Sequence, residues 1–336
     1  MPAMQRLVDS PKKVIMWIIV PVLILLVLLA FSSGPARRPA PGGISQLEQV
    51  ELGGMKQWIS IRGADLHAPV LLFLHGGPGS ANLAKLRLQV PELEQHFVVV
   101  TWDQRGAGKS APIGFDYDCL SIDQMVSDTH ALVSYLKARF GVEKFYLMGF
   151  SWGSIIGLNL ADQYPEDLYA YIGVSQVINP RESERISLDF VQENARQAGN
   201  DQAIDELSGI DPAYKGANWF KQLSIERKWL LQYGGVYYTT RSYSHEVMLL
   251  SSHEYSLAEV ALWPGRSSVA AADVAGSYAG EFQVNHPGAA STGVFFRRPV
   301  RQQRSPNYYR RIRPKADRPG RSRPGLVRKI GPRPIF

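Results

Sequence analysis

The residues best suited to chemistry surround Ser151, in the segment Gly149–Gly153, which reads Gly-Phe-Ser-Trp-Gly. An apolar run, Lys144–Met148, leads into this segment, and a run with helical spacing follows it. A G-x-S-x-G turn between a strand and a helix exposes a serine hydroxyl at the end of a sheet, and its small glycines permit the sharp bend. The spacing therefore predicts that Ser151 is a nucleophile that attacks carbonyl carbon. It would need a neighbouring base, and the alternative is a chance occurrence of the pattern.

A glycine-rich loop at residues 75–79 reads His-Gly-Gly-Pro-Gly and follows another apolar run. Glycines allow a loop to turn its backbone N–H groups toward a developing oxyanion. We expect Gly76 or Gly77, together with the N–H of Trp152, to form an oxyanion hole, with a simple tight turn as the alternative. His75 is interpreted as a structural residue of the loop rather than as a base.

A third polar segment, residues 103–110, ends in Gly-Lys-Ser, like the end of a phosphate-binding loop. That pattern requires a glycine four residues before the Gly-Lys-Ser, and Asp103 stands there. Nucleotide binding is therefore rejected. Asp103 and Arg105 are interpreted instead as a buried ion pair that braces the loops of the site.

The elements that would position these residues alternate between strands and helices. One helical pattern covers residues 122–140 and stops at Gly141, a plausible C-cap, and a second covers 154–162. The alternation predicts a mainly parallel sheet with helices on both faces. The strand-like runs are residues 49–52, 57–62, 70–74, 97–102, 144–148 and 169–177.

Four composition shifts suggest the domain organisation. Residues 32–45 are rich in Pro, Gly and Ser and are typical of a linker, and residues 46–178 would form the α/β core. Residues 179–262 have a helical, aromatic-rich pattern that predicts an inserted helical cap. In residues 263–336 the periodicity is lost, and a basic Pro/Arg-rich tail, predicted to be aberrant or disordered, stands where further core strands are expected.

The net charge of +7 originates in the tail. Residues 297–336 carry 14 Lys and Arg against one acid (net +13), whereas the rest carries 23 against 29 (net −6). A mildly acidic body lacks the basic surface typical of nucleic-acid binding, so we expect no nucleic-acid partner. The single cysteine, Cys119, excludes an internal disulfide and a multi-cysteine metal site.

The N-terminal region predicts membrane attachment. Residues 14–31 are 18 uncharged, mostly apolar residues, close to the ~20 that cross a bilayer. A cleaved signal peptide is the alternative, although this run exceeds the usual ~7–15 apolar residues of a signal core. Basic residues in the short tail 1–13 favour an N-terminus in the cytoplasm and a main body outside it.

Taken as a set and in this order, residues 75–79, 102–110 and 149–154 resemble the proline iminopeptidase branch of the α/β-hydrolase family. The resemblance covers roughly residues 47–262. It implies the α/β-hydrolase fold with a helical cap, no cofactor, and serine-dependent cleavage of an N-terminal residue, often proline, from small peptides. No metal is expected.

The resemblance also bears on the cap. In that branch, cap carboxylates hold the free amine of the substrate, although any one cap acid could equally be an ordinary surface residue. The Trp-x-x-Trp-Glu signature of the branch is absent, and residues 227–230 read Arg-Lys-Trp-Leu. An esterase with the same elbow and a different lid, and a non-catalytic, membrane-tethered relative, are the alternative functions. The candidate acids are Glu182, Glu184, Glu193 and Glu206.

The acid and histidine that follow the serine in this fold are not evident. Only His286 lies late in the chain, and no strand-like run precedes it. The family's Gly-Arg-x-Asp and Trp-Phe-Glu-x-Ser-Ala-His-x-Pro segments do not occur.

Both family segments become possible if the codons that could encode the tail are read in a frame shifted by one base. Residues 296–306 then permit Phe-Ala-Gly-Arg-Tyr-Asp-Ser-Asn-Ala-Pro, and residues 326–336 permit Trp-Phe-Glu-Lys-Ser-Ala-His-Ala-Pro-Phe. We therefore hypothesise a shift of reading frame near residues 263–272, which would leave this chain weakly active or inactive. The alternative is a genuine basic tail that binds anionic lipid or RNA.

Overall fold

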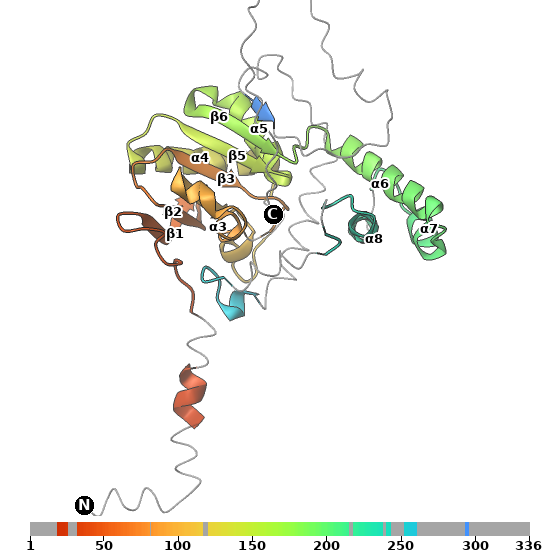
Figure 1. The fold of residues 1–336 in the computed structure, drawn as a ribbon, viewed down its shortest axis with the longest axis horizontal. Helices are drawn as coiled ribbons and strands as arrows, with labels where there is room; N and C mark the ends of the chain where they lie inside the picture. Colours follow the sequence, from red (N-terminus) through yellow and green to blue (C-terminus); the bar gives the residue numbers. More distant parts are fainter. Residues whose placement is uncertain are drawn as a thin grey trace, which may run out of the picture. The chain divides into compact units, whose positions relative to one another are not determined.

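The computed structural model describes residues 19–25, 32–80, 82–116, 120–214, 218–237, 240–242, 252–260 and 293–295. Within these residues, one sheet has the strand order β1-β2-β4-β3-β5-β6-β7 (Figure 1). The β1–β2 and β2–β4 pairs are antiparallel, and the other pairs are parallel. The strands are β1 (Ile44–Leu52), β2 (Met55–Gly63), β3 (Val70–Leu74), β4 (Val98–Asp103), β5 (Phe145–Phe150), β6 (Leu168–Val174) and β7 (Gly293–Phe295).

The parallel register brings the candidate segments to one edge of the sheet. Leu74 at the end of β3 pairs with Gly149 near the end of β5, and β4 pairs with β3 on its other side. Because the carboxyl ends of parallel strands share an edge, the loops after β3, β4 and β5 lie together there.

Helices α4 (Ile122–Phe140) and α5 (Trp152–Gln163) contribute to the main core at one face of the sheet. The α4 helix begins after Ser121, whose side chain accepts a hydrogen bond from the Gln124 N–H, and ends at Gly141 with φ 63°. This confirms the predicted helix and its glycine C-cap. At the other face, Leu71 and Phe73 pack with Leu86 of α3 (Lys85–Gln89). In the part of the chain that the structure describes, short 3₁₀ turns lie at η1 (Pro91–Gln95), η2 (Gly108–Ser110) and η4 (Pro165–Asp167).

Among the described residues of the segment predicted as a cap, helices α6 (Pro180–Gln197), α7 (Asp201–Ser208) and α8 (Trp219–Gln232) pack on one another and form a separate hydrophobic cluster. Asn179 and Asn200 cap the first two helices, because their side chains accept hydrogen bonds from N–H groups of the first turn. Leu188, Val191 and Trp229 are buried between the helices.

Two segments differ from the sequence prediction. Strand β1 begins at Ile44, inside the predicted linker, and the Ala36 carbonyl oxygen accepts a hydrogen bond from buried Arg62 at 3.1 Å. Within the predicted tail, β7 adds a short parallel strand beside β6 (Figure 1). The other residues of 263–336 lie outside the described residues.

Of the predicted anchor at 14–31, residues 19–25 form a short helix, and the other residues lie outside the described part of the chain, as does the tail 1–13. Nowhere in the described part is a helix long and apolar enough to span a bilayer.

Candidate active site

Ser151 occupies a turn that a non-glycine residue adopts only under constraint. It stands between the end of β5 and the start of α5, with φ 51° and ψ −117°. A positive φ is unfavourable for a residue with a side chain, so the surroundings must hold it. The Ser151 N–H donates to the Val174 carbonyl oxygen at 2.9 Å, and the Ser154 N–H donates to the Ser151 carbonyl oxygen at 2.9 Å.

The glycines on either side of this turn are required by close packing. A Cβ added at Gly153 would lie 2.2 Å from the Leu74 carbonyl oxygen and 2.6 Å from that of His75. A Cβ added at Gly149 would lie 2.6 Å from the Gly153 carbonyl oxygen. These distances are shorter than any real contact of a Cβ atom, so the elbow packs directly against the end of β3.

The glycine loop after β3 lies against Ser151, as the sequence predicts. A Cβ added at Gly76 would be 3.3 Å from the Ser151 Cβ. Gly77 has φ 134°, which favours glycine, and among the described residues its N–H donates no hydrogen bond to another backbone group. Trp152 is the first residue of α5, at the end of the helix where the dipole favours negative charge. Of the predicted oxyanion residues, Gly76 lies against Ser151 and Trp152 follows it in the chain, whereas the role of Gly77 stays a prediction.

His75 is fully buried, and both of its ring nitrogens have partners. Nδ1 donates to the Gly76 carbonyl oxygen at 2.6 Å, since a carbonyl can only accept, and Nε2 accepts from the Gln104 N–H at 3.1 Å. Burial lowers the pKa of His75 to about 4, so the ring is neutral near pH 7. A neutral ring with both nitrogens engaged fastens the glycine loop to the loop after β4.

Asp103 and Arg105 are both buried, but the predicted ion pair between them is wrong. Arg105 instead pairs with Asp128 of α4, with Nε–Oδ2 at 2.7 Å and Nη2–Oδ1 at 2.9 Å. Gln57 also donates to Asp128 Oδ2, at 2.7 Å. The Asp128 carboxylate is thereby well satisfied, and Arg105 ties the loop after β4 to α4 and to the β1–β2 turn, where it donates to the Gly53 carbonyl oxygen at 2.8 Å.

Asp103 has a different set of partners. Its carboxylate accepts from the Asn82 N–H at 2.9 Å, the Lys109 N–H at 2.8 Å and the Tyr255 hydroxyl at 2.8 Å. Burial raises the pKa of Asp103 to about 7, although these three donors oppose the shift.

The four acids that sequence analysis selected in the cap all have cationic partners. Glu182 pairs with Arg185 and Glu193 with Arg196, both exposed. Glu184 pairs with Arg227 at 2.6 Å, and Glu206 pairs with Lys228 at 2.7 Å. The first two are ordinary surface pairs, whose contribution to stability is small.

Sequence analysis missed Glu226, whose side chain is fully buried in the cap. Its Oε2 atom contacts Arg227 at 2.5 Å, while Oε1 has no hydrogen-bond partner among the described residues. Burial raises the pKa of Glu226 to about 7, and the nearby Glu184 carboxylate adds to the shift, against the effect of Arg227. The helical spacing from Leu223 to Trp229 gives the only sequence signal, and it does not distinguish a buried acid from a surface one.

The base and acid expected for a serine nucleophile are not found among the described residues. No hydrogen bond joins the Ser151 hydroxyl to a histidine there, and His286 lies outside that part of the chain. The described residues also contain no cluster of side chains that could bind a metal ion.

Comparisons with known proteins found a family model and several similar proteins. A family model described as "alpha/beta hydrolase fold" matches residues 69–203. A "Probable aminopeptidase YbaC" of Bacillus subtilis (strain 168) is 39% identical over 155 residues, which are 46% of this chain and 49% of that protein. A "Probable proline iminopeptidase" of Streptomyces coelicolor is 35% identical over 102 residues, 30% of each chain. Among solved structures, the epoxide hydrolase VrEH1 from Vigna radiata is 29% identical, with 42% of this chain and 44% of that chain covered and a TM-score of 0.35.

The chain thus spans about half the length of the first of these relatives and less than a third of the second. Within that span, the family match covers the glycine loop, the loop after β4 and the elbow. Residues 69–203 thus match the α/β-hydrolase family model, and the chain is similar to proteins named as a probable aminopeptidase and a probable proline iminopeptidase.

Proposed function

We propose that the chain is a serine hydrolase in which Ser151 attacks a carbonyl carbon. The observation that carries this proposal is the strained φ of 51° at Ser151, held beside Gly76 at the start of α5. The Ser151 Oγ atom bonds to the carbonyl carbon, its proton passes to a base, and the carbonyl electron pair moves onto oxygen. The N–H groups of Gly77 (or Gly76) and Trp152 stabilise that oxyanion. The intermediate then expels a protonated leaving group, and water releases the acyl group by the same steps.

The substrate class that we propose is short peptides with a free N-terminus, which makes the enzyme an aminopeptidase. The names of the two peptidase relatives support it. The cap also supplies an acid suited to an ammonium group. Glu226 is buried with one unpartnered oxygen, and a bound cation would offset the cost of ionising it there. Both carboxylate oxygens of each cap acid selected from sequence have hydrogen-bond partners. Glu226 uses only Oε2 to contact Arg227 and keeps Oε1 without a partner among the described residues, so it is the better candidate.

The proposal includes the frame shift in the tail. Under it, the lost Asp would straddle the codons of Arg301 and Gln302, and the lost His those of Pro332 and Arg333. Without these groups Ser151 stays protonated, and only a small residual rate over water remains.

The test is hydrolysis of prolyl p-nitroanilide and of p-nitrophenyl acetate by the full chain. We expect slow release from both, abolished in Ser151→Ala and retained in Ser134→Ala. Ser134 is a matched control, because its exposed hydroxyl bonds only to the His130 carbonyl oxygen of its own helix. Ester turnover without anilide turnover would support an esterase instead. Activity that survives Ser151→Ala would contradict the proposal, and no activity at all would indicate a non-catalytic relative.

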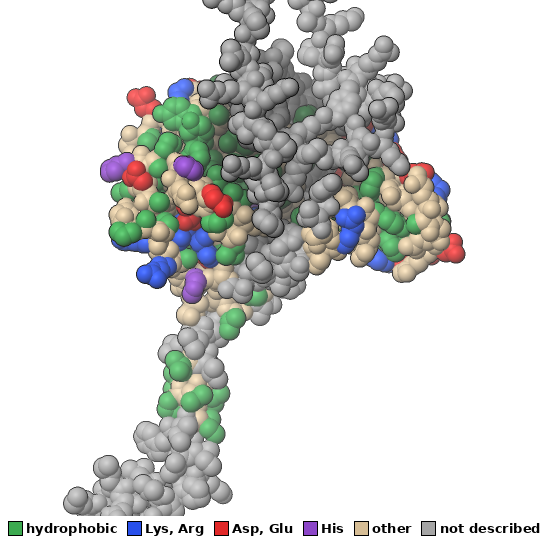
Figure 2. All heavy atoms as spheres, in the orientation of Figure 1, with side chains coloured by type: hydrophobic (Ala, Val, Ile, Leu, Met, Phe, Trp, Pro, Cys, Tyr) green, Lys and Arg blue, Asp and Glu red, His purple; other side chains and the backbone are tan. Residues whose placement is uncertain are grey.

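We also propose that residues 14–31 anchor the protein in a membrane, with the catalytic body outside the cytoplasm. The described part of this segment supports the idea, since the side chains of the helix at 19–25 are apolar and about half exposed (Figure 2). The protein should stay in the membrane pellet after an alkaline carbonate wash, and deletion of residues 1–31 should release it. Its body should be cleaved by protease added to intact cells. Release of the full chain by carbonate alone would contradict the anchor.

A further inference from the structure

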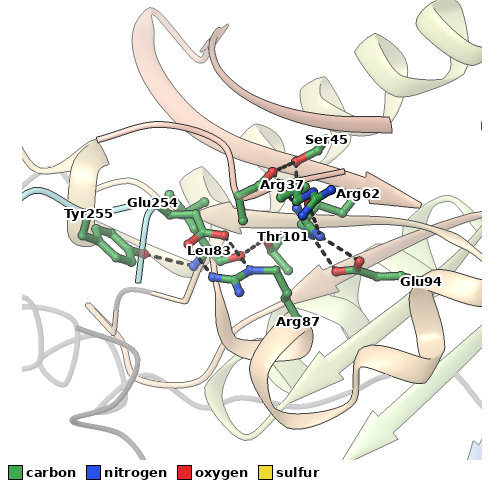
Figure 3. Close-up of polar contacts among 10 residues, drawn as sticks. Arg37, Ser45, Arg62, Leu83, Arg87, Glu94, Thr101, Glu254 and Tyr255 are labelled. Carbon is green, nitrogen blue, oxygen red and sulfur yellow. Dashed lines mark hydrogen bonds and ion pairs between the residues drawn. The ribbon is translucent and has the colours of Figure 1, made fainter. Parts of the chain in front are cut away.

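A short segment at the end of residues 179–262, which the sequence assigned to the cap, is instead bound to the hydrolase core. We call Ser252–Val260 the return segment. Its Glu254 carboxylate is fully buried and forms a bidentate ion pair with Arg87, at 2.9 and 2.8 Å (Figure 3). Glu259 pairs with Lys109 at 2.7 Å. Two ion pairs, one with a buried acid, fix this segment on the core.

Between these pairs, Tyr255 inserts its ring into the core beside Leu83. Its hydroxyl accepts a hydrogen bond from the Leu83 N–H at 3.0 Å (Figure 3) and donates one to Asp103 at 2.8 Å. The hydroxyl therefore bridges the end of the glycine-loop region and the end of β4, although it lies 152 residues from Asp103 in sequence.

The loop that carries the oxyanion glycines is thus held at both ends. At its start, the His75 ring accepts from the Gln104 N–H. At its far end, Asn82 donates to Asp103 and Leu83 donates to Tyr255. Thr101 adds a bond to the Leu83 carbonyl oxygen at 2.6 Å. The far end of the loop is therefore held by the Asp103 carboxylate and the Tyr255 hydroxyl, which are hydrogen-bonded to each other.

We propose that Tyr255, together with Asp103, is a positioning residue that holds the oxyanion loop in register with Ser151. This role rests on the proposed function, because the loop matters for rate only if its N–H groups stabilise an oxyanion. Tyr255 does not touch the reacting atoms. Its effect passes through Leu83 and Asn82 to Gly77. The return segment therefore links the end of the cap sequence to the catalytic geometry.

The test compares Tyr255→Phe with Tyr135→Phe in the full chain. Tyr135 is a matched control, since its hydroxyl also bonds to a carboxylate, Glu48 at 3.0 Å, but on α4 away from the loop. We expect the Asn82 and Leu83 amides to exchange hydrogen roughly ten-fold faster in Tyr255→Phe, because one buried hydrogen bond is lost. They should be unchanged in Tyr135→Phe.

Turnover of the ester substrate supplies the second readout. In Tyr255→Phe, kcat should fall roughly ten-fold at unchanged KM, less than the ~100–1,000-fold loss when an oxyanion donor is removed outright. Unchanged exchange at Asn82 and Leu83, or a rise in KM alone, would overturn the proposal. If the wild type shows no turnover, the proposed function fails, and the exchange measurement still decides whether Tyr255 holds the loop.

A second variant covers the case in which Tyr255→Phe does not fold. Asp103→Asn keeps the shape but cannot accept from Asn82, Lys109 and Tyr255 together, because its Nδ2 is a donor. Faster exchange of the same two amides is expected there. Wild-type protection in Asp103→Asn would equally contradict the proposal.

Discussion

The Ser154 hydroxyl donates a hydrogen bond to the carbonyl oxygen of Ser151, across 2.5 Å. The same hydroxyl accepts one from the Val177 N–H at 3.0 Å, and the Ser154 carbonyl oxygen accepts one from Tyr171 at 2.9 Å. The first turn of α5 is thereby tied to the end of β6. The strained backbone at Ser151 is supported by this network from the side opposite to the glycine loop.

Replacing Ser154 by Ala should slow the reaction of Ser151 without unfolding the protein. Loss of one buried hydrogen bond costs about 0.5–1.5 kcal/mol. If that cost falls on the alignment of the elbow, the rate drops roughly 2- to 13-fold. The rate of labelling by a fluorophosphonate measures it, with Ser134→Ala as the control. A Ser154→Ala variant that reacts at the wild-type rate would show that the brace does not align the nucleophile.

Replacing Gly153 by Ala should strongly destabilise the fold. The added Cβ would lie 2.2 Å from the Leu74 carbonyl oxygen, on a strand that cannot move independently of the sheet. Overpacking of this kind costs about 1–3 kcal/mol or more. Gly209→Ala is the control, because Gly209 has φ −89° and open space around its Cα. Thermal unfolding should show a large drop in Tm for the first variant and little change for the second.

The elbow, the glycine loop and most strands of the core could be predicted from sequence, because each depends on residues close together in the chain. Local patterns do not show partners that come from elsewhere. Arg105 was paired with Asp103, two residues away, whereas its partner is Asp128, 23 residues on. The sequence prediction placed the start of strand β1 too late, because the first residues of the strand include polar side chains. An edge strand tolerates such side chains.

Two further residues were missed for similar reasons. Glu226 lies in a helix with charged neighbours, so its burial depends on how three helices pack. Tyr255 stands in a segment without clear periodicity, and its contact with Asp103 spans half the chain. Both residues have a role in the proposals above. Contacts between residues far apart in the chain are therefore the features that the sequence prediction mainly failed to identify.

The buried carboxyl of Asp103 should make stability fall as pH rises through the acidic range. Its pKa is about 7 in the fold, against 3.8 for the free group, so between about pH 4 and pH 7 the folded state binds more protons than the unfolded state. Stability due to this group is therefore present at pH 4 and is lost by pH 7. His75 acts in the opposite direction, since its lowered pKa makes the unfolded state the stronger proton binder between about pH 4 and 6.5.

Asp103→Asn separates the two effects. We compare the urea concentration at the unfolding midpoint of the wild type with that of the variant. The wild-type midpoint should fall relative to that of the variant between pH 5 and pH 7, because only the wild type has the titrating carboxyl. A difference that is constant across this range, or that grows with pH, would contradict a raised pKa at Asp103.

Glu226→Gln should weaken binding of substrates that carry a free amine. If the buried carboxylate holds an ammonium group, KM for prolyl p-nitroanilide should rise, because the neutral amide loses the charge interaction. KM for p-nitrophenyl acetate, which has no amine, should not change. Glu193→Gln is the control, since Glu193 is an exposed acid paired with Arg196. Equal changes for both substrates would indicate that Glu226 only stabilises the cap.

The frame-shift hypothesis predicts an extra or missing base in the DNA that encodes residues 255–275. Restoring the frame should return an Asp and a His after the cap and raise turnover by several orders of magnitude, in line with the cost of losing triad members. A reliable DNA sequence that matches the present reading frame would refute the shift and leave the basic tail as genuine.

The most direct test of the central claim is to locate the adduct after long incubation of the full chain with a fluorophosphonate. Tryptic peptide mapping should place the label on residues 145–181, slowly formed, absent in Ser151→Ala and present in Ser134→Ala. No label on that peptide, or a label that persists in Ser151→Ala, would contradict the account of Ser151 as a nucleophile.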